Sequence, residues 1–392
     1  SNLIQSTYNA VDMLFVGRFT GTESLAAVSV CGPIMNVMII TLSGMSAGVL
    51  VVISSLLGAG ENTQARDAAH TSLALYAIMA AVLTLVGLAF TPQLLLAVQT
   101  PLSAMPEAKR YLYTVFAGMS FSFGYNLIGA LQQAQGNATA SMSFVLISSI
   151  VNILLDAVLI VGLHMGALGA ALGTVLAQFV AFCVGAVQFT HGNTVLQISL
   201  GEVRFHKKHL KNILLFGVPT AANEVMVNLA MLTVSGVANS FGLASSAAYG
   251  VGSRINSLAI FMDGAMNQTL SAYASQNIGA KNKKRALTGL WKAIAISVSM
   301  ALVSSLTVLV FAEDFAACFD ANPEVVRQSA AFLRVTIWSY PLFAAVGPLI
   351  GFIRGTGNLE ASLLVGVLAQ LCGSPLHRPN AARPRANAHG RS

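Results

Sequence analysis

Charged residues are scarce in this chain of 392 residues, and their scarcity excludes most classes of soluble protein. Asp, Glu, Lys and Arg make up 9% of the chain, whereas soluble domains contain about 25%. Hydrophobic residues reach 55%, and the mean hydropathy is +0.71. The composition therefore indicates a membrane protein.

Cysteine is also rare, and its placement argues against a disulfide framework or a zinc site. The four cysteines are scattered, mostly in apolar runs, without metal-ligand spacing. We expect them to be small core residues. No nucleophile has a credible partner base, so we predict neither an enzyme nor a resident cofactor. The net charge of +7 does not support nucleic-acid binding, because four of these charges lie in residues 373–392.

Long apolar runs follow one another with short polar breaks between them. Each is near the roughly 20 residues that cross a bilayer as a helix, and none alternates as the strands of a β-barrel do. We predict helices over about 1–18, 24–56, 66–90, 107–132, 139–163, 167–190, 210–238, 243–276, 284–312, 323–352 and 360–372. The predicted fold is an all-α polytopic membrane protein with about 11 of 12 transmembrane helices.

The first part of the chain recurs, weakly but in register, 221 positions later. Three loop motifs show this: Gly21 with Ser24, Gly58-Ala59 and Gly136-Asn137 recur as Gly242 with Ser245, Gly279-Ala280 and Gly357-Asn358. Duplicated apolar chains are typical of secondary transporters. Six helices per copy is an even number, so both copies share one orientation. We therefore predict two six-helix lobes in a parallel pseudo-two-fold repeat.

The basic residues predict how the chain is oriented. The connections at 201–212 and 280–285 each carry four Lys or Arg, whereas the connection at 313–324 carries four acids. Positive loops face the cytoplasm, so the first two connections are predicted to be cytoplasmic and the third external. Counting back places the N-terminus in the cytoplasm. We expect a multi-pass protein of a prokaryotic plasma membrane that acts as a monomer.

The repeat also predicts the domain division. We expect an N-terminal lobe over 1–200, a cytoplasmic linker over 201–212 and a C-terminal lobe over 213–372. The first helix is expected to lack its start, and the second copy to be cut short. Residues 373–392 hold four Arg and no acid. We interpret them as an aberrant, disordered tail on a truncated gene.

Acidic residues inside predicted spans are the strongest functional signal. The four are Asp12, Asp156, Glu224 and Asp263. Such groups are costly in a bilayer and mark function by default. Glu224 and Asp263 are less informative, since each is expected near a helix end or beside a glycine.

A polar cluster surrounds Asp156. Asn152 shares its helix face, and Thr174 and Gln178 share a face of the next helix. Carboxylate, amide and hydroxyl oxygens suit a small cation. With Asp12 nearby, two carboxylates could instead share a proton, for which Asp12 is the better candidate. The remaining alternative is that each acid merely accepts hydrogen bonds between helices.

Two other motifs are interpreted structurally. Gly44–Gly48 fits the G-x-S-x-G nucleophile pattern, but it lies in an apolar helix where close packing explains it better. His206–His209 lacks a third metal ligand, and we expect a solvated cytoplasmic face.

Several motifs together resemble the MATE family of multidrug and toxic compound extrusion transporters. They are Val11-Asp12 before Phe15–Arg18, Gly58–Gly60, Gln276 with Gly279-Ala280, Asn152 with Asp156, and Gly173-Thr174. The resemblance covers about residues 1–372. It implies a two-lobe antiporter that exports amphipathic, often cationic compounds by alternating access, driven by Na⁺ or H⁺.

The resemblance also implies a coupling site. In the DinF- and MepA-like prokaryotic type, the coupling positions map onto Asp12, Asn152, Asp156 and Thr174, where Na⁺ is one candidate ligand. The NorM-like branch also uses a Glu on helix seven and an Asp on helix ten. Apart from Glu324 at its start, helix ten of this chain has no acid, which argues against a cation site in the C-terminal lobe.

The substrate cavity is predicted less sharply. Candidate lining residues are Asn126, Tyr125, Gln178 and Glu224. A lipid-linked oligosaccharide flippase of the same superfamily is the alternative function. It would favour a cationic cavity, whereas Lys and Arg lie almost only near the ends of the spans, as Arg354 does. The substrate range and the choice between Na⁺ and H⁺ stay open.

Overall fold

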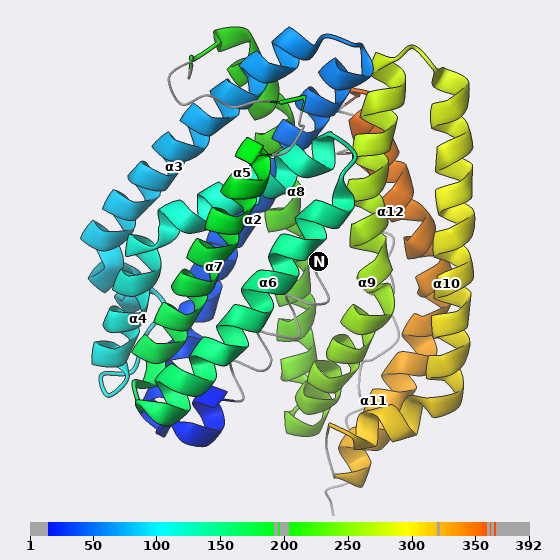
Figure 1. The fold of residues 1–392 in the computed structure, drawn as a ribbon. Helices are drawn as coiled ribbons and strands as arrows, with labels where there is room; N and C mark the ends of the chain where they lie inside the picture. The colour runs from blue at the N-terminus through cyan, green and yellow to red at the C-terminus, as the bar shows by residue number, and fades with distance from the viewer. Residues whose placement is uncertain are drawn as a thin grey trace, which may run out of the picture.

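The fold is built from long helices (Figure 1). The computed structural model describes residues 15–191, 195–196, 204–319, 322–358, 361 and 364–365. Its helices are α2 (Thr22–Gly58), α3 (Asn62–Ala97), α4 (Met105–Ala117), α5 (Met119–Ala134), α6 (Ala138–Asp156), the π-helix η1 (Ala157–Gly162), α7 (Gly166–His191), α8 (Lys207–Ser240), α9 (Leu243–Gly279), α10 (Lys283–Ala317), α11 (Pro323–Thr336), the 3₁₀ turn η3 (Ile337–Ser339) and α12 (Tyr340–Gly355). Most of the predicted helices 1–18 and 360–372, and the whole tail 373–392, lie outside the described residues.

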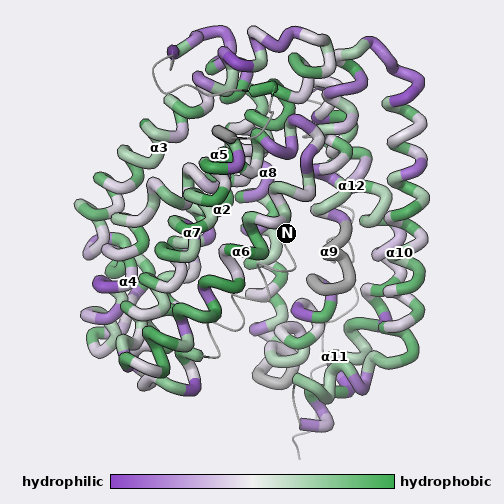
Figure 2. The backbone as a smooth tube through the Cα atoms, in the orientation of Figure 1, coloured by the Kyte–Doolittle hydropathy of each residue, from purple (hydrophilic) through white to green (hydrophobic). Residues whose placement is uncertain are grey.

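The described part is a polytopic membrane fold, as predicted. Seven of its helices are long and apolar enough to cross a bilayer, and the bent pair α4–α5 makes an eighth. Large apolar side chains on outer helices are exposed, including Leu85, Trp291 and Leu306. Hydrophilic residues gather instead at the upper end of the molecule (Figure 2). The surface therefore matches a protein surrounded by lipid.

The predicted repeat is confirmed by the bounds of the helices. α2 and α9 begin 221 residues apart and end 221 residues apart, and α5 and α12 do the same. Gly136 and Gly357 both have positive φ, at 83° and 87°. Asn137 and Asn358 each accept a hydrogen bond from the backbone N–H three residues later. The two copies thus share helix lengths, a left-handed glycine and a helix cap.

Helix four and its counterpart in the second copy are broken, although we predicted unbroken helices over 107–132 and 323–352. α4 and α5 bend by 48° around Gly118, and α11 and α12 are separated by η3. Gly118 and Ser339, the last residue of η3, are again 221 positions apart. A Cβ on Gly118 would overlap Val175 of α7, so this glycine admits a close neighbour at the bend.

The two copies meet mainly through α2, which contacts α8, α9 and α12. At its end, a Cβ on Gly58 would overlap the backbone of Gln276 in α9. A Cβ on Gly279 would likewise overlap the backbone carbonyl of Ser55 in α2. Ser55 and Gln276 are themselves 221 positions apart. The contact is therefore reciprocal about the pseudo-two-fold axis, as in an isologous interface.

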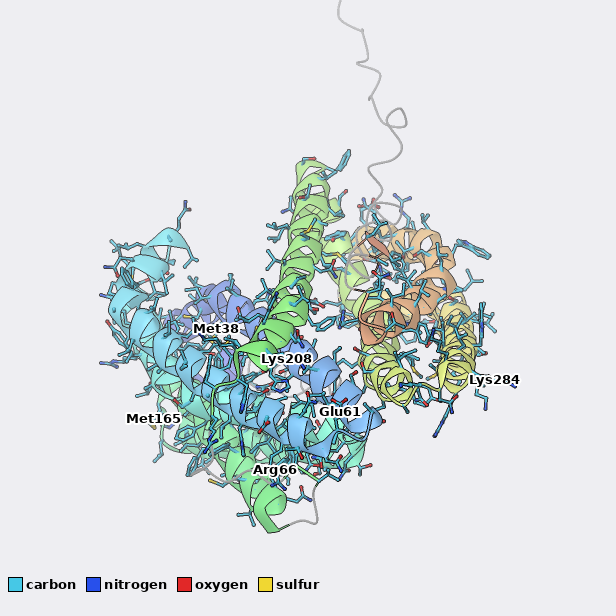
Figure 3. All side chains as sticks on the ribbon, turned by 90° about the horizontal axis from the view of Figure 1, so that it is seen from above. Met38, Glu61, Arg66, Met165, Lys208 and Lys284 are labelled. Carbon is cyan, nitrogen blue, oxygen red and sulfur yellow. The ribbon has the colours of Figure 1, made fainter. Side chains whose placement is uncertain are left out.

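α8 joins this interface along the preceding turns of α2. A Cβ on Gly44 would overlap Ala221, and one on Gly48 would overlap the carbonyl of Ile213. The structure thus confirms that the glycines of this motif serve close helix packing. Seen from above, α8 stands between the two groups of helices (Figure 3).

The close contacts lie toward one end of the molecule, which we call the Gly58 end. Toward the opposite end, Leu229 and Leu232 of α8 are exposed, as is Phe241 directly after it. A Cβ on Gly236 would meet no atom within 4 Å. The copies are therefore packed tightly at the Gly58 end and diverge away from it.

The segment before α8 is docked on α3. The Thr71 hydroxyl lies 3.4 Å from the Arg204 carbonyl and accepts a hydrogen bond from the His206 N–H at 3.2 Å. His206 Nε2 lies 3.9 Å from Asp67 Oδ2, and His209 is only 6% exposed. The expectation of a solvated face at His206–His209 holds for Lys207 and Lys208, which are exposed, but not for His209, which is buried.

The close crossing of α2 and α9 at Gly58 predicts that the stability of the protein is sensitive to a side chain at this position. Gly58→Ala should lower the free energy of unfolding by about 1–3 kcal/mol, because the new methyl overlaps backbone that cannot rotate away. Gly32→Ala is the matched control, since it lies in the same helix and its Cβ would meet no atom within 4 Å. Thermal unfolding in detergent measures both. Equal midpoints for the two variants would contradict the crossing.

Candidate functional site

Asn152 and Asp156 form the core of the candidate site. They lie one turn apart on α6, on one face as predicted. Asp156 is 0% exposed and Asn152 is 2% exposed. Neither amide atom of Asn152 has a hydrogen-bond partner among the described residues. A buried amide without a partner is costly, which makes this pair the candidate binding site.

Gly173 of α7 brings the neighbouring backbone against this pair. A Cβ at this position would overlap Asp156 Oδ1 and would stand 3.5 Å from Asn152 Nδ2. The absence of a side chain therefore leaves room for the carboxylate. The sequence analysis used Gly173 only as part of a family motif and did not predict this contact. The signal was its place directly before Thr174, a predicted site residue.

The helix changes its winding directly after Asp156. Residues Ala157–Gly162 form the π-helix η1, in which the Leu163 N–H bonds the Val158 carbonyl at 2.9 Å. The prediction of one regular helix over 139–163 is therefore wrong in its last part. Short π segments inside α-helices occur frequently at functional sites.

The other predicted coupling residues are placed only in part. Thr174 is half-buried on α7, next to Gly173. Within the described residues it makes no hydrogen bond to Asn152 or Asp156. Asp12 lies outside the described residues. The structure therefore brings together Asn152, Asp156 and the Gly173-Thr174 segment.

The oxygen donors of this pair fit a small cation better than a transition metal. They comprise one carboxylate and one amide, which are the hard ligands that Na⁺-sized ions take. In the described part of the chain, no three His, Cys, Asp or Glu residues are grouped to hold a metal ion. A Na⁺ site here therefore remains a prediction that also depends on Asp12.

The predicted cavity residues of the first copy are linked to one another. The Ser122 hydroxyl on α5 donates to Gln178 Oε1 on α7. Asn126 Nδ2 donates to the Ser122 carbonyl at 2.8 Å, and Tyr125 is half-buried on the same helix. Ser122 was not predicted. Ser122 connects Gln178 with Asn126, so α5 and α7 share a polar contact. The same two helices also share an aromatic contact, because the ring centroids of Phe121 and Phe179 are 4.8 Å apart.

Glu224 lies on α8, apart from the first-copy residues. It stands well inside α8, which spans Lys207–Ser240, so its expected position near a helix end is wrong. Arg354 of α12 interacts with it electrostatically, although no ion pair within 4 Å joins them. Arg354 is only 7% exposed. The fourth predicted cavity residue therefore lies within electrostatic range of a buried cation of the second copy.

Asp263 lies against a glycine, as Asp156 does. It is in the middle of α9, which continues without a break from Leu243 to Gly279. A Cβ on Gly347 of α12 would overlap Asp263 Oδ1 and stand 2.7 Å from Oδ2. Gly264, the glycine beside it, does not interrupt α9. This carboxylate fills a gap between two helices of the second copy.

Comparison with known proteins agrees with the duplicated helical scaffold. A family model described as MatE matches residues 1–158 and again residues 219–377. The probable multidrug resistance protein YoeA of Bacillus subtilis is 27% identical over 94% of this chain and 81% of its own length. The multidrug export protein MepA of Staphylococcus haemolyticus is 24% identical over 93% of this chain and 81% of its own length.

Solved structures show the same architecture. An outward-facing multidrug resistance MATE family transporter of the MOP superfamily has a TM-score of 0.86 and 25% identity, covering 94% of this chain and 82% of its own. A MOP superfamily transporter from Pyrococcus furiosus has a TM-score of 0.85 at 25% identity, with the same coverage. The two family matches span more than half of the chain. The chain therefore belongs to the MatE family, whose members are secondary transporters rather than enzymes.

Proposed function

We propose that this chain exports amphipathic, often cationic compounds in exchange for an inward-moving Na⁺ or H⁺. The buried pair of Asn152 and Asp156, backed by Gly173, is the observation that carries this proposal. The relatives named as multidrug resistance and multidrug export proteins support the class of cargo.

The coupling chemistry follows from burial. An ionised carboxylate removed from water requires a counter-ion or a proton. Asp156 can take either, and the Asn152 amide offers an oxygen to a cation and an N–H donor to the carboxylate. A cation bound at this pair would neutralise the site. The pair can therefore exist in two charge states that differ by one ion.

In alternating access, the charge state of the pair changes which arrangement of the two copies is favoured. The copies are packed at the Gly58 end and diverge toward the other end, and a similar transporter was solved in an outward-facing state. We assign the Gly58 end to the cytoplasm from the basic connections. Opening that end requires α8 and α9 to leave α2. An ion and a substrate that prefer different arrangements then compete through their differential affinities.

The polarity of the second copy favours cationic cargo over the flippase alternative. Arg354 is the one buried Lys or Arg in the described part of the chain, and it interacts with Glu224. Apart from Arg354, the described spans therefore offer no buried cation for an oligosaccharide phosphate. The Pyrococcus furiosus transporter is described as having a binding pocket of reverse polarity, which suggests a different function for that protein.

Asp156 and Asp263 each lie against a glycine, and replacing them one at a time distinguishes a role in ion coupling from a role in helix packing. Asp156→Asn should reduce ion-driven efflux of a cationic dye from vesicles to background, because the amide cannot take up a proton or carry a charge. Asp12→Asn is expected to do the same. Asp263→Asn is the matched control in the second copy and should retain most transport. Na⁺ and pH gradients are imposed separately, and the amount of reconstituted protein is equalised.

Two results would contradict this assignment. Efflux that survives Asp156→Asn at normal protein levels would make the pair structural. Efflux lost only with Asp263→Asn would move the coupling group to the second copy.

Asn152 predicts a trade-off between stability and transport. Asn152→Leu should raise the free energy of unfolding by about 1 kcal/mol or more, because it removes two buried polar atoms without partners. It should also abolish efflux. Ser149→Ala is the comparison on the same helix, since the Ser149 hydroxyl donates to the Val145 carbonyl at 2.8 Å. A destabilised Asn152→Leu protein would mean that the amide is part of the packing.

A further inference from the structure

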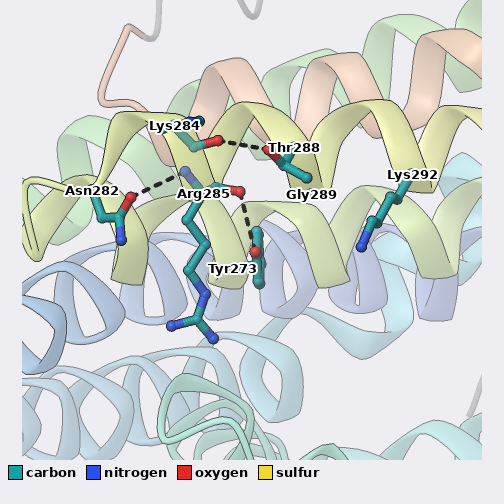
Figure 4. A pocket seen from close by; sticks show the side chains of 7 residues that line it. All are labelled: Tyr273, Asn282, Lys284, Arg285, Thr288, Gly289 and Lys292. Atoms are coloured by element: carbon teal, nitrogen blue, oxygen red, sulfur yellow. Dashed lines mark hydrogen bonds between the residues drawn. The ribbon is translucent and has the colours of Figure 1, made fainter.

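A basic hollow lies between α9 and α10 at the Gly58 end (Figure 4). Its volume is about 370 Å³, and it is open to the surroundings. Its lining residues are Tyr273, Asn282, Lys284, Arg285, Thr288, Gly289 and Lys292. Three of them are cations and none is acidic, so the hollow would attract an anion.

Packing and hydrogen bonds hold the walls of the hollow in place, whereas the charged groups of Arg285 and Lys292 form no ion pair with a described acid. A Cβ on Gly289 would overlap the Tyr273 ring, so this glycine lets the ring lie against α10. The Tyr273 hydroxyl donates to the Arg285 carbonyl at 3.2 Å, and Asn282 Oδ1 accepts from the Arg285 N–H at 3.0 Å. The side chains of Arg285 and Lys292 extend to the same side of α10 (Figure 4). Neither forms an ion pair within 4 Å with a described acid.

The repeat shows that the scaffold does not require these cations. The positions 221 residues before Lys284, Arg285 and Lys292 are Thr63, Gln64 and Thr71. Those before Asn282 and Thr288 are Glu61 and Asp67. The first copy therefore has two acids and no cation where the second has three cations. Both copies share one orientation, so the general preference for positive cytoplasmic loops acts on both and cannot explain the difference.

The corresponding surface of the first copy is already occupied. There, Thr71 and Asp67 hold the segment that carries Arg204 and His206. A basic segment thus covers an acidic surface. The second copy presents the opposite charge, so the matching occupant is an anion. The tail 373–392, with four Arg and no acid, has the wrong sign to fill the hollow.

The position of the hollow along α10, close to the boundary between membrane and water, indicates that the anion comes from the membrane. Trp291, next to Lys292, is 67% exposed, and exposed Trp is typical of the boundary between membrane and water. Ile296, Val303 and Leu306 follow on α10, and all three are exposed. The hollow therefore lies directly above an apolar belt along which acyl chains could pack.

We infer that the hollow formed by Tyr273, Arg285 and Lys292 binds the phosphate group of an anionic phospholipid. A guanidinium and an ammonium share the charge of the phosphate, and the amide of Asn282 and the hydroxyl of Thr288 add polar contacts. Basic pockets between transmembrane helices on the cytoplasmic side are known binding places for such headgroups. The site is separate from the Asn152 and Asp156 pair and does not depend on the proposed transport.

Lipid titration of the purified protein in detergent tests this inference. Dihexanoyl phosphatidylglycerol should raise the thermal unfolding midpoint, and dihexanoyl phosphatidylcholine should not. Arg285→Gln with Lys292→Gln should raise the half-saturating phosphatidylglycerol concentration about tenfold or more, since each basic group near an anionic lipid contributes about fivefold. Lys281→Gln with Lys283→Gln is the matched control, because it removes two charges from the same connection without changing the lining.

Each outcome is decisive. The inference is supported if only the lining variant loses the response, and Lys292→Gln alone should give an intermediate loss. Equal losses in both double variants would overturn it, because attraction would then depend on net charge alone. Inorganic phosphate is titrated in parallel. If it matches phosphatidylglycerol at the same concentrations and with the same sensitivity to the lining variant, the ligand is a soluble phosphate and the lipid assignment fails.

Discussion

The arrangement of the described helices depends on the close crossing of α2 and α9. Gly58 lies against the backbone of Gln276, and Gly279 lies against that of Ser55, so two helix ends approach without intervening side chains. Lipid supplies little hydrophobic driving force between helices, and small residues that permit backbone contact become the main source of association. Gly44 and Gly48 of α2 permit the same close backbone contact with α8. Because the tight contacts lie near one end, the copies can separate at the other without breaking their own cores.

Within this duplicated scaffold the chemistry is not duplicated. Asp156 and Asp263 each lie against a glycine of a neighbouring helix, yet Leu42 stands 221 positions before Asp263. The basic hollow of the second copy likewise has no counterpart in the first. Duplication thus explains helix lengths, breaks and the symmetric crossing. The basic hollow is carried by the second copy alone among the described residues, where it does not disturb the shared contacts.

The sequence predicted the helices well, because the absence of water in a bilayer forces every span to be apolar and helical. It also predicted the repeat and the shared face of Asn152 and Asp156. It did not predict the break at Gly118 or the π-helix after Asp156. Pro33 and Pro219, by contrast, lie inside helices that continue past them. The contact of Gly173 with Asp156 depends on how α6 and α7 pack, and no pattern within one helix contains that information.

The central claim is that an ion and a substrate compete through the buried pair on α6. The most direct measurement adds a cationic dye to the purified protein in weak buffer while pH and Na⁺ electrodes record both ions. The account predicts that dye binding releases a proton or a Na⁺ ion, and that Asp156→Asn protein binds the dye without releasing either. Dye binding that releases no ion from the unmodified protein, at any pH or Na⁺ concentration, would contradict it.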